Sequence, residues 1–283
     1  MTIIKKISDL QNFLGLYRKD GQKIGFAPTM GALHPGHISL ITESQKNNGL
    51  TVSSIFINPV QFNDPKDYEK YPITLENDIL LLEKAGCNVL FLPSVSEVYP
   101  DGTTQQKKYE LGYLESVLEG QYRPGHFQGV CMVIERLLDI VKPDNLYLGQ
   151  KDYQQCMVIK KLTELTGLDQ TVHTRICPTL REPDGLAMSS RNMRLSETER
   201  KNAGTIYKTL QLIKEGLGKN DLRSLKKEAK KILSEKGFKP DYVEIADAST
   251  LQLVNDWDGK QKLVALIAAF LNEVRLIDNL PLN

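Results

Sequence analysis

The sequence predicts an α/β fold with a doubly wound parallel sheet, followed by a smaller α+β domain. Up to about residue 180, short apolar runs alternate with helical patterns, which is typical of a parallel sheet covered by helices. After residue 194 two helical patterns come first and three apolar strand patterns follow in succession, as in small α+β domains. We therefore expect one domain over residues 1–180 and a second over residues 181–283.

Each expected strand of the first domain is a short apolar run that ends at a turn signal. The run KIGFAPTM precedes a Gly-containing turn, TVSSIFI ends at Asn58-Pro59, and NVLFLP ends at its proline. The helix that follows Thr74 can end at Gly86, and the helix GVCMVIERLLDIVK stops before Pro143. The strands are expected at 23–30, 51–57, 88–93, 144–149 and 171–180.

The second domain is expected to contain helices near 196–216 and 221–236, and strands in DYVEIADA, KLVALIAAF and EVRLID. Residues 181–194 form a polar connection between the domains.

Composition places the chain among ordinary globular proteins. Hydrophobic residues make up 41% and charged residues 25% of its 283 residues. A net charge of +1 argues against a general nucleic-acid coat. The four cysteines are scattered without a C-x-x-C pair, and no apolar run approaches 18 residues. We expect a cytoplasmic protein with reduced thiols, without a membrane or nucleic-acid partner.

The segment GFAPTMGALHPGH carries the first chemical signal. A buried strand leads into a turn with Gly31, and a helix opens at His34-Pro35-Gly36-His37. Proline suits the first helical turn, and histidines three apart lie on the same side of it. Unpaired N–H groups and the helix dipole favour an anion there, such as a polyphosphate. Taken alone, H-x-x-H could instead be a chance surface pair or a metal pair; a zinc site would need a third ligand that does not stand nearby.

Two further polar segments directly follow strands. INPVQF places the amides of Asn58 and Gln61 at the carboxyl end of the sheet, where open α/β folds bind ligands. Loop solubility or turn capping is the simpler interpretation of these amides. In LGQKDYQQC, Lys151 stands at a helix start, where the dipole disfavours a cation unless a phosphate is bound. Asp152 beside it suits a helix cap.

Two polar loops complete the set. DGLAMSSRN contains hydroxyls and a guanidinium that can wrap a phosphate, or else it is a solvated linker. YRPGHFQGV carries Arg123 and His126 before an apolar helix, where they could hold a carboxylate or simply be exposed turn residues.

In this order and spacing, the segments PTMGALHPGH, NPVQF, RPGHFQGV, KDYQQ and DGLAMSSRN resemble the pantothenate synthetase family, and the resemblance covers the whole chain. It implies a Rossmann-like fold of the nucleotidyltransferase superfamily, with HPGH as its HIGH-type motif and MSSRN as a mobile phosphate loop. It implies a ligase that joins pantoate to β-alanine through an acyl-adenylate, with ATP as substrate and Mg²⁺ as cofactor. It also implies a homodimer, with the C-terminal domain covering the active site.

The resemblance implies a role for each matching residue. The expected catalytic residues are His34, His37, Lys151, Ser189 and Arg191. ATP would be bound by Pro28, Met30, Gly36, His37, Gly149, Lys151, Asp152, Leu180, Met188, Ser189, Ser190 and Arg191. Pantoate would be bound by Gln61, Gln155 and Asn58, β-alanine by Tyr71, Arg123 and His126, and a metal ion by Asp78.

The chain departs from the family pattern at three positions: Gln150 replaces an expected Glu, Ile73 replaces Arg, and Asn77 stands where an acid is expected. Two other functions stay open. One is another HxGH-type adenylyltransferase, which transfers AMP to a small metabolite and stops. The other is a nucleotide-sensing or RNA-binding protein without catalysis.

Overall fold

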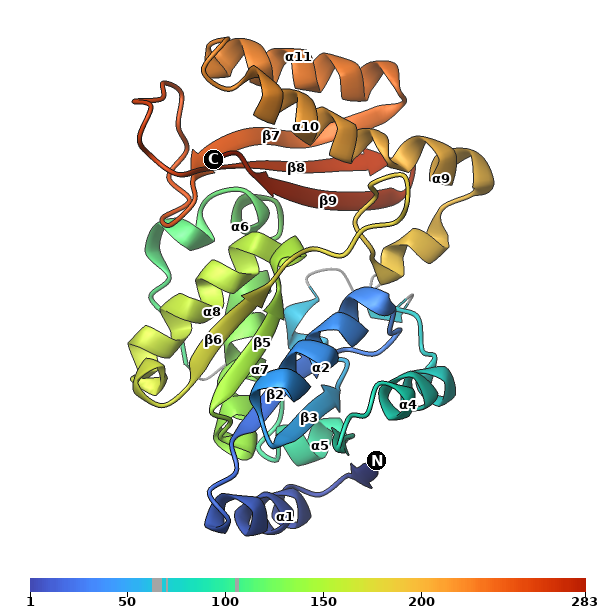
Figure 1. Ribbon diagram of the computed structural model, residues 1–283, viewed down its shortest axis with the longest axis vertical. Helices are drawn as coiled ribbons and strands as arrows, with labels where there is room; N and C mark the ends of the chain where they lie inside the picture. Colours follow the sequence, from blue (N-terminus) through green and yellow to red (C-terminus); the bar gives the residue numbers. More distant parts are fainter. Residues whose placement is uncertain (63–67, 70, 105–106) are drawn as a thin grey trace. The chain divides into compact units, whose positions relative to one another are not determined.

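The computed structural model describes residues 1–62, 68–69, 71–104 and 107–283 (Figure 1). These form two compact units. The first contains Met1–Gln150 and Val158–Pro178, and the second contains Lys151–Met157 and Thr179–Asn283. The division after Pro178 lies close to residue 180, the boundary expected from the sequence. The segment Lys151–Met157 groups with the second unit although it lies within the first expected domain.

The first unit is built on a six-stranded sheet in the order β1-β4-β3-β2-β5-β6, and its strand pairs are parallel. The doubly wound α/β fold expected from the sequence is therefore confirmed. The edge strand β1 was not expected, because its three residues lack the apolar run that marks the others. The strands are β1 Thr2–Ile4, β2 Ile24–Thr29, β3 Leu50–Ile55, β4 Val89–Phe91, β5 Asn145–Gly149 and β6 His173–Cys177.

Helices flank this sheet, and α2 packs on β2, β3 and β5 (Figure 1). Beneath α2 lies a core that includes Leu40, Ile41 and Leu90. Helix α7 is buried along most of its length, as its nearly continuous apolar sequence requires. The helices are α1 Ile7–Lys19, α2 Pro35–Asn47, α4 Leu75–Lys84, α5 Val95–Val98, α6 Glu119–Tyr122, α7 His126–Val141 and α8 Tyr153–Thr166, with short 3₁₀ turns η1 Pro59–Gln61, η2 Gly112–Glu115, η3 Gln150–Asp152 and η4 Leu168–Gln170.

The second unit has a three-stranded antiparallel sheet in the order β7-β8-β9. Helices α10 and α11 cover it around a core that includes Ile213, Leu225 and Ile267. The single helix expected over 196–216 is two helices, because the chain breaks at Gly204 where it passes Asp184. The elements are η5 Ser190–Arg194, α9 Glu197–Ala203, α10 Thr205–Gly216, α11 Leu222–Glu235, β7 Phe238–Asp247, β8 Leu263–Leu271 and β9 Val274–Pro281.

All four cysteines are buried. Burial raises the pKa of Cys87 and Cys177 to about 11 and that of Cys131 to about 12, so these thiols stay protonated at neutral pH.

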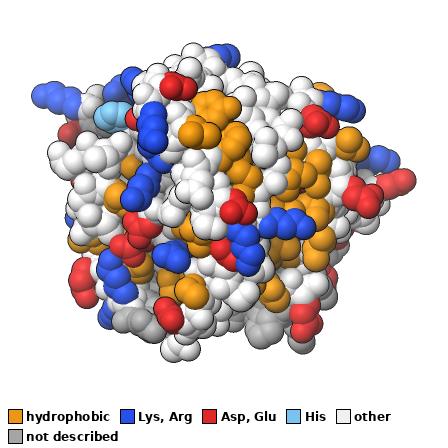
Figure 2. All heavy atoms as spheres, turned by 90° about the horizontal axis from the view of Figure 1, so that it is seen from below, with side chains coloured by type: hydrophobic (Ala, Val, Ile, Leu, Met, Phe, Trp, Pro, Cys, Tyr) orange, Lys and Arg blue, Asp and Glu red, His pale blue; other side chains and the backbone are white. Residues whose placement is uncertain are grey.

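In the described part of the chain, no helix has both the length and the apolar character to span a bilayer. Figure 2 shows apolar side chains gathered in patches on the face seen from below. Among the exposed apolar residues of the first unit are Leu16 and Leu80.

Candidate functional site

The sheet of the first unit has a topological switch point between β2 and β5. From β2 the chain builds outward through β3 and β4 on one side, and from β5 through β6 on the other. In open α/β sheets ligands bind outside the carboxyl ends of the strands at such a point. The HPGH segment follows the carboxyl end of β2, and Gly149 ends β5. The fold therefore places the HPGH segment where ligand binding is expected.

The two histidines of HPGH are fixed by the helix end that they occupy. His34 is the N-cap of α2, and its Nδ1 accepts the N–H of Gly36 at 3.2 Å. The Nδ1 of His37 accepts the N–H of His34 at 3.3 Å, and the two ring centroids are 4.0 Å apart. Because each Nδ1 acts as an acceptor, the neutral rings carry their proton on Nε2. Two imidazole N–H donors thus stand together at the positive end of α2.

The turn η1 follows β3, the strand next to β2. Asn58 is the N-cap of η1 and Gln61 is its last residue. Asn58 is buried, and its Nδ2 donates to the backbone oxygen of Gly129 at 3.1 Å and to Oε1 of Gln61 at 3.3 Å. Its Oδ1 accepts the hydroxyl of Tyr99 at 3.0 Å. Both ends of the Asn58 amide are therefore occupied by protein partners, one of which is the Gln61 side chain.

Gln61 connects the two motifs, because its Nε2 lies 2.8 Å from Sδ of Met30 in the segment after β2. Helix α7 packs closely behind η1 at Gly129. A Cβ at that position would lie 2.5 Å from the Val60 oxygen and 2.7 Å from the Gln61 Cα. This contact with the η1 backbone leaves no room for a side chain and so fixes the position of Gln61.

The three residues expected to bind β-alanine gather around the same turn. His126 is buried, its Nδ1 lies 2.8 Å from the Gln61 oxygen, and its Nε2 lies 3.0 Å from Nη1 of Arg123. Since the carbonyl only accepts and the guanidinium only donates, these contacts fit the neutral ring with its proton on Nδ1. The ring of Tyr71 meets that of Phe62 edge to face, with centroids 5.9 Å apart. Nη1 of Arg123 also lies 3.8 Å from Oε2 of Glu119.

In the second unit, Lys151 lies in η3 immediately before α8. Its Nζ is 3.7 Å from Oδ1 of Asp152, and its backbone oxygen accepts from Nδ2 of Asn279 at 2.9 Å. Gln155 is half-buried in the first turn of α8. The hydroxyl of Tyr153 donates to the oxygen of Ala248 at 2.7 Å, which ties this helix start to its own unit.

The DGLAMSSRN segment (184–192) contains the second arm of a closed hairpin and the first residues of η5. The N–H of Met188 donates to the oxygen of Leu180 at 3.0 Å, and Arg181 pairs with Ala187. At the base, Arg181 forms two hydrogen bonds with the buried Asp278, at 2.6 and 3.0 Å. Ser189 caps η5 by accepting the N–H of Arg191 at 3.3 Å. The residues expected to bind phosphate therefore directly follow a hairpin that hydrogen bonds hold in place. They are Ser189, Ser190 and Arg191.

Asp78, expected to bind a metal ion, is buried in the first turn of α4. Both of its oxygens accept hydrogen bonds from protein donors, two of them backbone N–H groups. No cluster of three or more His, Cys, Asp or Glu side chains suited to a metal occurs among the described residues. The metal role expected of Asp78 stays a prediction, and its three hydrogen bonds are all to groups of the protein.

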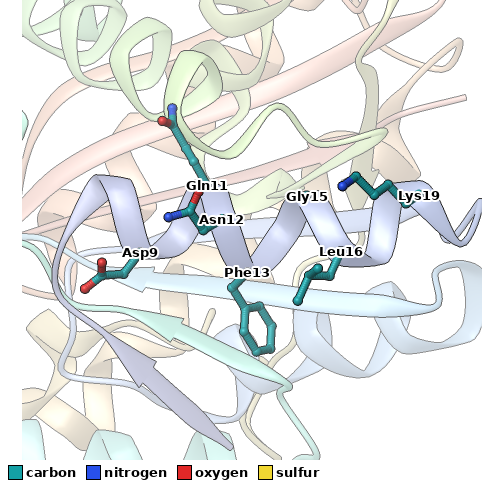
Figure 3. Close-up of a pocket in the computed structure, with 7 residues that line it drawn as sticks. All are labelled: Asp9, Gln11, Asn12, Phe13, Gly15, Leu16 and Lys19. Atoms are coloured by element: carbon teal, nitrogen blue, oxygen red, sulfur yellow. The ribbon is translucent and has the colours of Figure 1, made fainter.

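A shallow pocket runs along the outer face of α1, where Phe13 and Leu16 point the same way and Asp9 and Lys19 stand at its ends (Figure 3). It is lined by α1 alone and contains none of the expected site residues. His34, Asn58 and Gln61 instead follow the carboxyl ends of β2 and β3.

Comparison with known proteins agrees with this geometry. The sequence profile described as pantoate-beta-alanine ligase matches residues 2–281. The chain belongs to the pantoate–β-alanine ligase family. Pantothenate synthetase of Azobacteroides pseudotrichonymphae is 45% identical over 282 residues, covering 99% of each chain. That of Bacteroides thetaiotaomicron is 44% identical over 281 residues, covering 99% of this chain and 98% of the relative.

Solved structures of the pantoate–β-alanine ligase family share the fold along the whole chain. The crystal structure of pantothenate synthetase from Thermus thermophilus superposes with a TM-score of 0.92 at 38% identity, covering 100% of this chain and 99% of that one. The ligase from Francisella tularensis, complexed with β-γ ATP and β-alanine, superposes with a TM-score of 0.81 at 39% identity, covering 99% and 97%.

Sequence reasoning missed the residues that fix the positions of the site residues. Tyr99, Gly129 and Arg181 contact site residues or the segments that carry them, but they stand in separate parts of the sequence. Asp78 was named from the sequence, as a metal ligand, but its contact with the turn before His34 joins residues 45 and 46 positions apart and leaves no local pattern.

Proposed function

We propose that this chain joins pantoate to β-alanine at the expense of ATP, releasing AMP and pyrophosphate. A carboxylate is a poor acyl donor, because oxide would have to leave. The pantoate carboxylate oxygen would attack the α-phosphorus of ATP and expel pyrophosphate, forming a mixed anhydride with AMP. The unprotonated amine of β-alanine would then attack the anhydride carbonyl, AMP would leave, and the amine nitrogen would lose its proton.

The observation that carries the proposal is the pair of Nε2–H donors at the start of α2. Both rings are held by backbone N–H groups on Nδ1. Charge on the phosphates grows as pyrophosphate leaves, and donors that are already oriented stabilise such charge without reorganising. Lys151, Ser189 and Arg191 would supply further positive charge and hydrogen bonds to the phosphates. The remaining residues of the ATP set would bind the nucleotide: Pro28, Met30, Gly36, Gly149, Asp152, Leu180, Met188 and Ser190.

The residues proposed to bind pantoate and β-alanine also act by hydrogen bonding and positioning. Gln61 and Gln155 would hydrogen-bond the hydroxyls of pantoate, with Asn58 orienting Gln61. Arg123, His126 and Tyr71 would hold β-alanine beside the acyl group. Positioning of the two substrates then provides much of the rate, as it does when reacting atoms are held close. A nucleophilic cysteine is not needed, and buried thiols of raised pKa are poorly suited to that role.

Mg²⁺ would neutralise charge on the phosphates of ATP, and no step of the proposal requires a protein ligand for it. We also propose a homodimer, supported by the family membership and by exposed apolar side chains on the first unit. Sedimentation velocity at micromolar concentration tests this directly, and a monomer over that range would contradict it.

The test of function is a balanced product analysis. The protein is incubated with ATP, Mg²⁺, pantoate and β-alanine, and AMP, pyrophosphate and pantothenate are quantified. The proposal predicts equal amounts of the three products. An adenylylated product that retains AMP would identify a transferase instead, and nucleotide binding without turnover with any acid would identify a sensor.

A further inference from the structure

Asp78 is a buried carboxylate on α4 that reaches the turn before His34. It is 1% exposed. Its Oδ2 accepts the N–H of Ala32 at 2.9 Å, and its Oδ1 accepts the N–H of Leu33 at 2.8 Å and the hydroxyl of Thr74 at 2.9 Å. One side chain thus ties the start of α4 to the turn that leaves β2.

That turn has an unfavourable backbone conformation. Gly31 has φ +86° and Ala32 has φ +48°, so two successive residues are left-handed. For a residue with a Cβ this conformation costs free energy and persists only where the surroundings impose it. A Cβ on Gly31 would lie 3.1 Å from Oδ2 of Asp78. Successive backbone N–H groups that converge in this way form an anion-binding concavity, and the carboxylate of Asp78 occupies it.

The turn determines where HPGH begins. Leu33, held through its N–H by Asp78, directly precedes His34, the N-cap of α2. We propose that Asp78 is a positioning residue, which holds the Ala32–Leu33 turn as a built-in anion and thereby aims the imidazoles of His34 and His37 at the phosphates of ATP. The inference rests on the proposed function, because it requires ATP at the N-terminus of α2.

The alternative role for Asp78 is a metal ligand. A carboxylate that binds Mg²⁺ must offer an oxygen lone pair toward the ion and its waters. The oxygens of Asp78 instead face two backbone N–H groups and a hydroxyl, and the side chain is buried. The two roles differ in one measurable respect: a metal ligand acts only when the metal is present, whereas a positioning residue acts with or without it.

The experiment compares Asp78→Asn with Glu76→Gln, a matched loss of charge at an exposed position in the first turn of the same helix. ATP binding is measured by isothermal titration calorimetry in EDTA and again with excess Mg²⁺. The amide NH₂ that Asp78→Asn introduces would face a backbone N–H, so we expect ATP binding about ten-fold or more weaker in both conditions. Glu76→Gln should match wild type. Asp78→Asn binding that equals wild type in EDTA and weakens only with Mg²⁺ overturns the proposal.

Thr74→Val decides the question if Asp78→Asn does not fold. It removes one donor to Oδ1 and leaves both backbone N–H contacts, so we expect ATP binding in EDTA to weaken about three-fold. Unchanged binding would overturn the positioning role. A wild-type protein that binds ATP but makes no pantothenate would defeat the proposed function alone, since the binding comparison does not depend on turnover.

Discussion

Asn58 donates its side-chain N–H to Oε1 of Gln61 at 3.3 Å while remaining buried itself. The contact fixes which end of the Gln61 amide accepts and which donates, because the Asn58 nitrogen can only donate. Tyr99 in turn fixes the Asn58 amide by donating to its Oδ1. Two side chains in series, Tyr99 and Asn58, therefore orient the glutamine proposed to recognise pantoate.

Asn58→Ala should raise the KM for pantoate about ten-fold or more, because it leaves buried partners without a hydrogen bond. The KM for ATP should change little. Tyr99→Phe removes only the outer hydrogen bond and should shift the KM for pantoate in the same direction by less. Steady-state kinetics with each substrate varied in turn checks this, and equal losses for ATP and pantoate would assign Asn58 to structure.

Gly129→Ala should raise the KM for pantoate by displacing η1, since its Cβ would meet backbone atoms of Val60 and Gln61. Gly15→Ala is the matched control within α1, where an added Cβ has nothing within 4 Å. The control should stabilise the protein by about 0.5–1 kcal/mol, as Gly-to-Ala changes inside helices do. Urea unfolding and pantoate kinetics on both variants check the pair. Wild-type pantoate kinetics in Gly129→Ala would contradict the close packing of α7 on η1.

His34→Ala and Lys151→Ala should each lower adenylate formation by about a hundred-fold, the loss typical of a charge-stabilising donor. His34→Asn separates chemistry from folding, because Asn caps helices well but lacks the Nε2–H of the imidazole. We expect His34→Asn to have the same free energy of unfolding as wild type and to form the adenylate as slowly as His34→Ala. Near-wild-type turnover in a folded His34→Asn would remove the phosphate role of this ring.

Asp184 links the hairpin to α9 through its ion pair with Arg200. The hydrogen bond from Arg200 lowers the pKa of Asp184, so its contribution to stability is present above the ordinary Asp pKa and is lost as pH falls through the lower folded value. Because the pair is partly exposed, Asp184→Asn should cost only about 0.5–1 kcal/mol at pH 7. The difference from wild type in urea unfolding should vanish as the pH is lowered below about 4. A difference that persists unchanged at low pH would assign the effect to packing.

The sequence was sufficient for the main sheet, because the runs around Phe26, Val52 and Leu146 are continuous and apolar and each ends at a turn. It also located HPGH, since Pro35 follows a strand and a turn and suits the first turn of a helix. The N-terminal strand was too short to stand out, and Gly204 gave no sign that it would split a helix. The contact between α4 and the turn before His34 depends on tertiary packing, and local patterns carry no information on it.

The roles that we propose for Asp78 and Asn58 differ from those expected from the sequence for a related reason. Family resemblance places a residue near a site but does not say which way its polar atoms point. Both side chains are buried and engaged with protein groups. Residue type alone cannot distinguish a direct ligand from a side chain that holds one.

The central claim is that ATP and pantoate react before any amine is needed. Positional isotope exchange tests it most directly. ATP labelled with ¹⁸O in the bridge between the α- and β-phosphorus is incubated with the protein, Mg²⁺ and pantoate, without β-alanine. We predict that the label moves into non-bridging positions, because pyrophosphate rotates and returns while the pantoyl-adenylate stays bound. Exchange should be absent without pantoate, and slower in Ser189→Ala and Arg191→Ala. Label that moves only when β-alanine is present would contradict the adenylate mechanism, even if the final product were pantothenate.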